Sequence, residues 1–284
     1  MTDAERLCLS IRQAPACLVT VDSAQGSVPR EVGAWMALPA GGGAPIGSIG
    51  GGHLEWQALA EAQQRLAEHL AGRPARPALR RRALGPALGQ CCGGTVVLRF
   101  ECVGADDAPA LAARLAPQRR PLALFGGGHV GRALERVLRP LPFALHWIDS
   151  RDGVFPEDLP AAVHCEHSEP VQGAVPTLAA GSMVLVMSFS HAEDLDIVAA
   201  CLARQRARAD LPFIGLIGSR TKWARFRHRL EARGFAPEEL AQVGCPIGVP
   251  GIHGKQPEVI AVAVAAQLLM QPPRPSPAKR QKNG

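Results

Sequence analysis

Glycines at a fixed spacing give the first indication of chemistry in this chain. Gly126, Gly128 and Gly131 follow the apolar run 121–125 and precede a helical pattern. Between a strand and a helix, such glycines allow a tight turn, let a phosphate approach the backbone and let the helix pack closely. The amino end of the helix offers unpaired N–H groups to the anion. The spacing therefore predicts a phosphate-binding loop.

An acidic residue follows this loop at the distance typical of a ribose-binding carboxylate. Asp149 ends a second predicted strand, 143–149, and lies 18 residues after Gly131. A carboxylate at this position accepts a hydrogen bond from a ribose hydroxyl. Gly127 and His129 complete the loop, and the histidine ring faces either the anion or solvent. Loop and acid together predict a site for a ligand that carries a phosphate.

Other polar residues also follow predicted strands in the second half of the chain. Arg151, Ser219 and Lys222 lie in such loops, as does the segment 188–191. Strands separated by helices predict a parallel, doubly wound sheet, whose ligands bind beyond the carboxyl ends of the strands. Lys222 lies in the first turn of a predicted helix, where a cation is unfavourable unless an anion or solvent compensates it. We therefore expect these loops to share one edge of the sheet.

The first half of the chain holds a second glycine triplet and a pair of adjacent thiols. Adjacent thiols in a glycine-rich turn are either reactive groups, soft enough for a metal or a sulfur donor, or small residues that lead into a strand. No second cysteine pair stands at zinc spacing, so we expect no structural zinc site. The candidate residues of the first half are Gly50, Gly51, Gly52, His53, Glu55, Cys91 and Cys92.

The elements that position these residues fall into two sets. The chain of 284 residues is 47% hydrophobic, which is enough for two cores. Residues 1–115 predict a smaller α+β domain, and residues 116–270 alternate strands and helices and predict a Rossmann-like parallel sheet. The predicted fold class is therefore α/β, with the Rossmann-like domain second. Residues 271–284 predict a disordered basic tail.

The net charge of +6 is local, because the last 14 residues contribute four basic side chains and no acid. Aromatic residues make up 4% of the chain, so stacking platforms for nucleic acid are scarce and we expect no nucleic-acid partner. No apolar run reaches the length of a membrane span, and the charged amino end does not match a signal segment. We therefore expect a cytoplasmic protein, away from membranes, with reduced cysteines.

Several segments together resemble one protein family. They are 26–30, 47–55, 88–94, 125–131, 147–151, 215–222, 245–249 and 254–258. Over about residues 15–270, the chain resembles the xanthine dehydrogenase accessory proteins of the XdhC/CoxI family. His53 stands where the CoxI-like branch would carry cysteine, which favours the XdhC branch.

The resemblance implies a carrier rather than an enzyme. Such proteins bind the molybdenum cofactor while a cysteine desulfurase replaces an oxo ligand of molybdenum by sulfur, and then deliver it to apo-xanthine dehydrogenase. It implies a homodimer, a site formed by loops of both domains, and contact of Cys91 or Cys92 with molybdenum or the transferred sulfur. Whether a nucleotide also binds the glycine loop stays open. Two alternatives remain: an NAD(P)-dependent oxidoreductase, and a scaffold that docks desulfurase to dehydrogenase.

Overall fold

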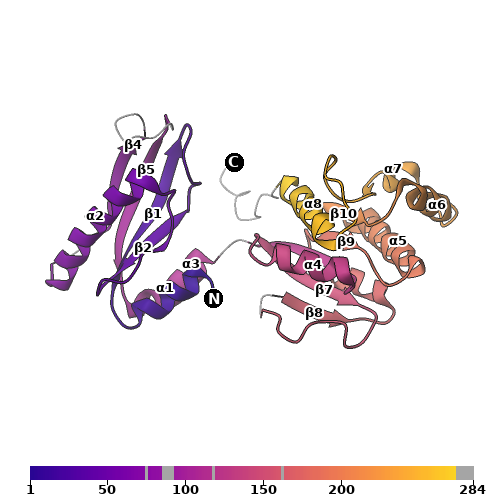
Figure 1. Ribbon diagram of the computed structural model, residues 1–284, viewed down its shortest axis with the longest axis horizontal. Coiled ribbons are helices and arrows are strands. Elements are labelled where there is room, and N and C mark those ends of the chain that lie inside the picture. The colour runs from indigo at the N-terminus through magenta and orange to yellow at the C-terminus, as the bar shows by residue number, and fades with distance from the viewer. Residues whose placement is uncertain (74–75, 85–92, 117–118, 161–162, 273–284) are drawn as a thin grey trace. The chain divides into compact units, whose positions relative to one another are not determined.

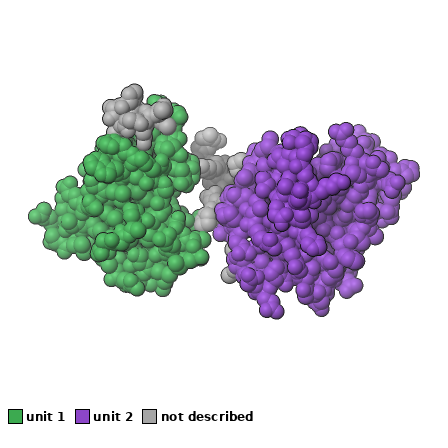
Figure 2. Space-filling model, viewed as in Figure 1, with its two compact units in different colours: residues 1–117 green, residues 118–284 purple. Residues whose placement is uncertain are grey.

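The structure is a computed structural model that describes residues 1–73, 76–84, 93–116, 119–160 and 163–272. The chain divides into two compact units, Met1–Pro117 and Gln118–Gly284, which Figure 2 shows in different colours. The predicted tail lies outside the described residues from position 273 onward. Among the described helices, none combines the length and the apolar character needed to cross a membrane.

The first unit is built on an antiparallel sheet of five strands in the order β3-β2-β1-β5-β4 (Figure 1). In chain order its elements are α1 (Asp3–Ile11), β1 (Ala16–Gln25), β2 (Trp35–Pro39), β3 (Ile46–Gly47), α2 (Gly52–Leu70), β4 (Ala78–Ala83), β5 (Thr95–Val103), the 3-10 turn η2 (Ala105–Asp107) and α3 (Ala108–Leu115).

Strand β1 lies at the centre of this sheet and is buried on both faces. Cys17 and Val19 pack in the cluster that includes the buried side of α2, whereas Ala16 and Leu18 pack with residues of α1 and α3. Successive side chains of a strand point to opposite faces, so one apolar run serves two cores. The first unit is therefore a sheet between two helical layers, in agreement with the predicted α+β domain.

The second unit contains a parallel sheet of six strands in the order β11-β10-β9-β6-β7-β8. Numbered within the unit, this order is 6-5-4-1-2-3, the strand order of a Rossmann sheet. Its elements are β6 (Arg120–Phe125), α4 (His129–Leu138), β7 (Phe143–Asp149), β8 (Val163–His167), η3 (Val171–Thr177), β9 (Met183–Val186), α5 (His191–Arg208), β10 (Phe213–Leu216), α6 (Arg220–Glu231), α7 (Pro237–Leu240), β11 (Val243–Gly244) and α8 (Pro257–Met270). The predicted fold class is confirmed.

Helices cover both faces of this sheet (Figure 1). Leu124 and Trp147 pack with residues of α4 and α8, whereas Ala123 and Phe125 pack with residues of α5 and η3. Burial on both faces explains why β6 and β9 are continuous apolar runs rather than alternating ones. Strand β8 was not predicted, because its sequence Val-His-Cys-Glu-His is half polar, as suits a strand at the edge of a sheet.

Candidate functional site

The candidate site is the edge of the second sheet at which β6, β7, β9 and β10 end. These four strands are parallel neighbours, so the loops that follow them meet along one edge, as predicted. We call the loops 126–131, 149–151, 187–194 and 217–222 the rim. The connections change direction between β6 and β9, and this switch point is where open α/β sheets bind ligands.

Two glycines of the first rim loop are required by close packing. Gly126 has a φ of +122°, and a Cβ atom there would overlap the carbonyl oxygen of Met187. A Cβ atom at Gly131 would overlap the carbonyl oxygen of Gly126, which also accepts a hydrogen bond of 2.9 Å from the indole Nε1 of Trp147. The glycines therefore bring strand, loop and helix into contact.

The second glycine of the motif faces open space instead. Gly128 is the N-cap of α4, has an ordinary φ of −72° and makes no side-chain capping bond. A Cβ atom at this position would meet nothing within 4 Å, and the next residue, His129, is exposed. The first-turn N–H groups of a helix have no partner within the helix. The amino end of α4 is therefore accessible to an anion.

Asp149 lies beside this loop, but its carboxylate is already fully engaged. Oδ2 accepts hydrogen bonds from the Gly127 N–H at 2.6 Å and from Arg151 Nη2 at 2.9 Å, while Oδ1 accepts from the backbone N–H and Nε of Arg151, both at 2.9 Å. Burial alone would raise the pKa of Asp149, but these hydrogen bonds lower the pKa overall. A carboxylate has about four lone-pair positions, so a ribose hydroxyl could bind Asp149 only after Arg151 moves.

Arg151 is held from two sides. Its guanidinium pairs with Asp149 and lies 4.8 Å from the ring centroid of Phe189, whose side chain is 68% exposed. A cation over an aromatic face is attracted by the electrons of the ring. Arg151 is therefore held in one conformation at the rim, where Asp149 compensates its charge.

The first turn of α5 presents a buried acceptor to the rim. Ser190 caps the helix by accepting the Glu193 N–H at 3.2 Å, but Glu193 Oε1 accepts from Ser150 Oγ at 2.7 Å, so only one half of a capping box forms. Glu193 Oε2 is buried, and no hydrogen-bond partner for it occurs in the described part of the chain. An unsatisfied buried acceptor costs about 1–3 kcal/mol. A donor from a bound ligand would remove that cost.

Lys222 ties α6 to α5 rather than projecting freely. Its Nζ donates to Asp194 Oδ2 at 2.6 Å and to the Ile217 carbonyl at 2.8 Å. Asp194 is buried and also accepts from the N–H and hydroxyl of Ser188, both at 2.8 Å. The ion pair explains why a cation is tolerated in the first turn of a helix. Ser219 caps that helix by accepting the Lys222 N–H at 3.1 Å.

A cavity of about 430 Å³ opens beside this turn of α6. It is lined by His191, Ile217, Gly218, Ser219, Thr221, Lys222, Arg225 and Phe226. Cys245 lies nearby, with Sγ 4.0 Å from the Ser219 carbonyl oxygen. Burial raises the pKa of the Cys245 thiol, Lys222 lowers it and Asp194 raises it, with a net upward shift. Sequence reasoning did not select Cys245, Glu193 or Asp194 as site residues, because only the fold gathers them here.

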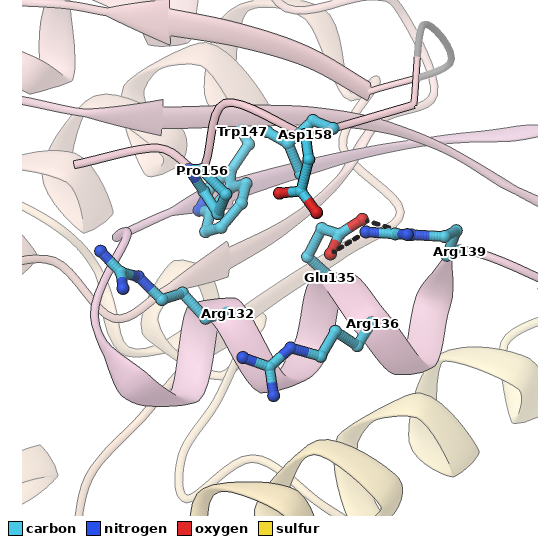
Figure 3. A pocket seen from close by; sticks show the side chains of 8 residues that line it. Arg132, Glu135, Arg136, Arg139, Trp147, Pro156 and Asp158 are labelled. Carbon is cyan, nitrogen blue, oxygen red and sulfur yellow. Dashed lines mark hydrogen bonds and ion pairs between the residues drawn. The ribbon is translucent and has the colours of Figure 1, made fainter. Parts of the chain in front are cut away.

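A second cavity, of about 420 Å³, lies along the flank of α4 (Figure 3). Its charges are of both signs, and Arg139 forms two hydrogen bonds of 2.9 and 3.0 Å with the buried Glu135. Arg132 Nη2 donates to the Val154 carbonyl at 2.9 Å. A Cβ atom at Gly127 would press against Val154, so Arg132 fixes the segment that packs on the glycine loop. The cavity therefore lies beside groups that support the rim.

The glycine triplet of the first unit has its own carboxylate. Glu55 Oε1 accepts hydrogen bonds from Ser48 Oγ at 2.6 Å, the Ile49 N–H at 2.9 Å and the Gly50 N–H at 3.2 Å. Burial alone would raise the pKa of Glu55, but the Ser48 hydroxyl and the backbone N–H groups lower the pKa overall. His53 is exposed and stacks on Trp56, with ring centroids 5.4 Å apart. Glu55 thus holds its own loop.

The predicted site residues therefore fall into three groups. The second-unit residues lie at one rim, and those at 50–55 share one loop of the first unit. Cys91 and Cys92 lie outside the described residues. The assignment of these residues to a ligand stays a prediction.

Fold and rim together define a two-unit protein with a Rossmann domain whose ligand edge carries an accessible helix end. Residues 122–268, more than half of the chain, match the family described as the XdhC Rossmann domain, and residues 11–76 match the XdhC and CoxI family. The chain belongs to the XdhC and CoxI family, as the sequence predicted.

Two further proteins are similar over nearly the whole chain. The uncharacterized protein YqeB of Escherichia coli (strain K12) is 28% identical over 266 residues, which are 92% of this chain and 44% of that protein. The chain thus spans less than half the length of this relative. The crystal structure of a xanthine dehydrogenase from Bacillus halodurans has a TM-score of 0.73 at 19% identity and covers 95% of each chain. At that identity the likeness shows a shared fold.

Proposed function

We propose that this protein takes part in the maturation of xanthine dehydrogenase, by holding the molybdenum cofactor and passing it to the apoenzyme. Its membership of the XdhC and CoxI family supports such a role. The observation that carries the cofactor part of the proposal is the accessible amino end of α4 at Gly128, on the same rim as Glu193 Oε2, which is buried and has no hydrogen-bond partner among the described residues.

The rim offers groups that fit the cofactor. The cofactor carries a phosphate monoester, a pterin with N–H donors and a metal held by sulfur. The N–H groups at the start of α4 suit the phosphate, and Glu193 Oε2 suits a pterin N–H. Cys245 provides a thiol next to the rim residue Ser219. Cys91 and Cys92 stay candidates for contact with the metal or the transferred sulfur. When bound, the cofactor supplies the molybdenum centre of the recipient enzyme.

In this proposal the protein's residues bind and release the cofactor, and none of them acts as a catalyst. Arg151, which Asp149 holds in position, would donate a hydrogen bond to an anionic group of the ligand. The proposed partners are apo-xanthine dehydrogenase and a cysteine desulfurase, and the proposed assembly is a homodimer in the cytoplasm. A scaffold that never binds cofactor would retain these partners when the glycine loop is blocked.

The test is the identity of the small molecule that the purified chain carries. Protein from a host that makes the cofactor should release a pterin on denaturation, detected by the fluorescence of its oxidised form and by mass spectrometry. Gly128→Val places a side chain where space is open, so we expect a normal fold but at least roughly tenfold less pterin, because the phosphate loses the helix end. Gly104→Val, also in open space and in the first unit, is the matched control.

Two results would contradict the proposal. If protein from such a host carries no pterin, the proposal that it holds the cofactor is wrong. If Gly128→Val carries as much pterin as wild type, the glycine loop does not take part in binding. Tight binding of NAD(H) or NADP(H) with turnover would instead favour an oxidoreductase. The engaged carboxylate of Asp149 argues against that alternative, since the ribose-binding acid of such enzymes must be available to the ribose.

A further inference from the structure

Three metal-ligating side chains lie together on one face of the second sheet. His146 belongs to β7, and His164 and Glu166 belong to the edge strand β8. The parallel register places His164 opposite His146 and Glu166 opposite Ile148. Side chains two residues apart in a strand share a face, so all three project from the face that carries Ile148. The rim loops lie beyond the ends of these strands.

The ligand atoms of these three residues lie near the separations that they would have around a bound metal ion. Small side-chain rotations would bring them to the required separations. One ligand atom from each residue can be chosen so that all three lie within 4.8 Å of one another. His146 Nε2 and Glu166 Oε2 are 2.8 Å apart, and the two imidazole centroids are separated by 4.6 Å. With bonds of about 2.0–2.2 Å to zinc, ligand atoms stand roughly 3.3 Å apart. His164 is exposed, so its ring can turn the remaining distance.

The donor set determines which ions would bind. Two imidazoles and one carboxylate suit borderline transition metals, whereas Mg²⁺ and Ca²⁺ prefer oxygen ligands alone. We propose that His146, His164 and Glu166 bind one divalent transition-metal ion, Zn²⁺ in the first instance, on the face of the sheet at its β8 edge. Three protein ligands leave a coordination position for water or for a ligand from another molecule. This proposal is independent of cofactor binding at the rim.

A hydrogen bond between His146 and Glu166 is the simpler use of two of these residues, because it ties the edge strand to its neighbour. This hydrogen bond does not account for the third residue, His164. The His164 ring packs on His146 from the directly opposite position, and its nitrogen falls within the same 4.8 Å. Sequence spacing could not reveal the site, because the ligands come from two strands and form no short motif.

The experiment uses the full chain without an affinity tag, stripped with EDTA and then dialysed. Calorimetric titration with Zn²⁺ should show one site per chain, and Co²⁺ should give visible ligand-field bands without the charge-transfer band of a cobalt–thiolate bond. His164→Ala and Glu166→Gln should each weaken binding at least about tenfold, since even loss of an outer-shell partner costs 10–100-fold. His167→Ala, an exposed histidine of the same strand with the opposite parity, should bind as wild type.

Several outcomes would overturn the metal site. Absence of Zn²⁺ binding would leave the His146–Glu166 hydrogen bond as a tie between strands. A thiolate band would assign the bound metal to cysteines instead. Unchanged affinity in both His164→Ala and Glu166→Gln, with circular dichroism showing a native fold, would place the ion elsewhere.

Discussion

The chain contains the sequence Gly-Gly-Gly-His twice, each time running into the start of a helix, and the two loops are held in different ways. In the first unit, Gly50, Gly51 and Gly52 all have positive φ, and the carboxylate that accepts the N–H groups of Gly50 and Gly51 belongs to Glu55 in the first turns of α2. In the triplet of the second unit, Gly126–Gly128, only Gly126 has positive φ, and the carboxylate, Asp149, comes from the neighbouring strand.

This difference separates a loop held by a carboxylate of its own segment from a loop held by a carboxylate of a neighbouring strand. Glu55 and the groups that it accepts lie within eight consecutive residues, so the first loop satisfies itself locally. In the second loop, Asp149 takes the Gly127 N–H and leaves the helix end at Gly128 accessible. The same four residues can therefore be held by a local carboxylate in one context and by a tertiary partner in another. The two loops differ in where the carboxylate comes from, which is the same segment for Glu55 and a neighbouring strand for Asp149.

The largest expected effect is on the first glycine of each loop. Gly126→Ala should lower the free energy of unfolding by roughly 3–5 kcal/mol, because strained φ adds to overlap with the Met187 backbone. Gly50→Ala should cost less, about 1–3 kcal/mol, because its Cβ would meet the side chains of Pro29 and Arg30 rather than backbone atoms. Urea unfolding followed by circular dichroism measures both. Gly128→Ala is the control and should change stability by less than about 1 kcal/mol; equal losses at 126 and 128 would contradict the comparison.

A smaller effect is expected when the charge of the second carboxylate is removed. Asp149→Asn should destabilise by about 2–3 kcal/mol, since it breaks a buried ion pair whose arginine can still turn toward solvent. Thermal unfolding is the measurement. Asp152→Asn, three residues along and 95% exposed, should stay within about 0.5 kcal/mol of wild type. Similar losses in the two variants would mean that Asp149 does not hold the loop.

The carboxylate of the first loop should show its contribution through pH. The pKa of Glu55 is lowered in the folded chain, so its stabilisation is full above the ordinary value of 4.5 and is lost as pH falls through the lower folded value. Glu55→Gln should therefore be less stable by about 1–2 kcal/mol at pH 7 and should approach wild type in acid. Urea unfolding midpoints of the variant and of wild type, measured between about pH 3 and pH 7, test this. A stability difference that stays the same over this range would show that the contribution of Glu55 does not depend on its charge.

The smallest effect is expected for the histidines that follow the two triplets. His53 and His129 are both exposed, so replacement of either by alanine should change stability by less than about 0.5 kcal/mol. Thermal melting of the two variants beside wild type is sufficient. Surface substitutions usually change stability by about 0.5 kcal/mol or less. A loss above about 1 kcal/mol for only one of the two variants would show that this histidine side chain makes a stabilising contact with its loop.

Much of the second unit could be predicted because its signals are local. Glycine spacing, the apolar run of β6 and the position of Asp149 follow from one stretch of chain, and the structure places them as expected. The amino end of α6 was likewise predicted, since Lys222 was expected in the first turn of a helix. The rim itself followed from the alternation of strands and helices, which sets the direction of every strand.

What could not be predicted depends on partners far apart in the sequence. Arg151 engages all of Asp149 only through a side-chain conformation that no spacing encodes. Lys222 reaches Asp194, 28 residues away, so a residue that looked like an anion contact is an internal tie. Strand β8 was missed because an edge strand with polar side chains has neither a strong apolar run nor a turn signal. Local pattern predicts elements, whereas side-chain pairing requires the fold.

The indole of Trp147 gives the rim an optical reporter of its own. Its side chain is fully buried, donates to the Gly126 carbonyl at 2.9 Å and packs edge-on against Phe155, with ring centroids 5.2 Å apart. Its emission is therefore sensitive to the carbonyl dipole of the glycine loop, whereas Trp56, 65% exposed, emits from a solvated site in the other unit. A ligand that shifts the loop should change the emission of Trp147, and comparison with Trp147→Phe separates that change from the emission of Trp35, Trp56 and Trp223.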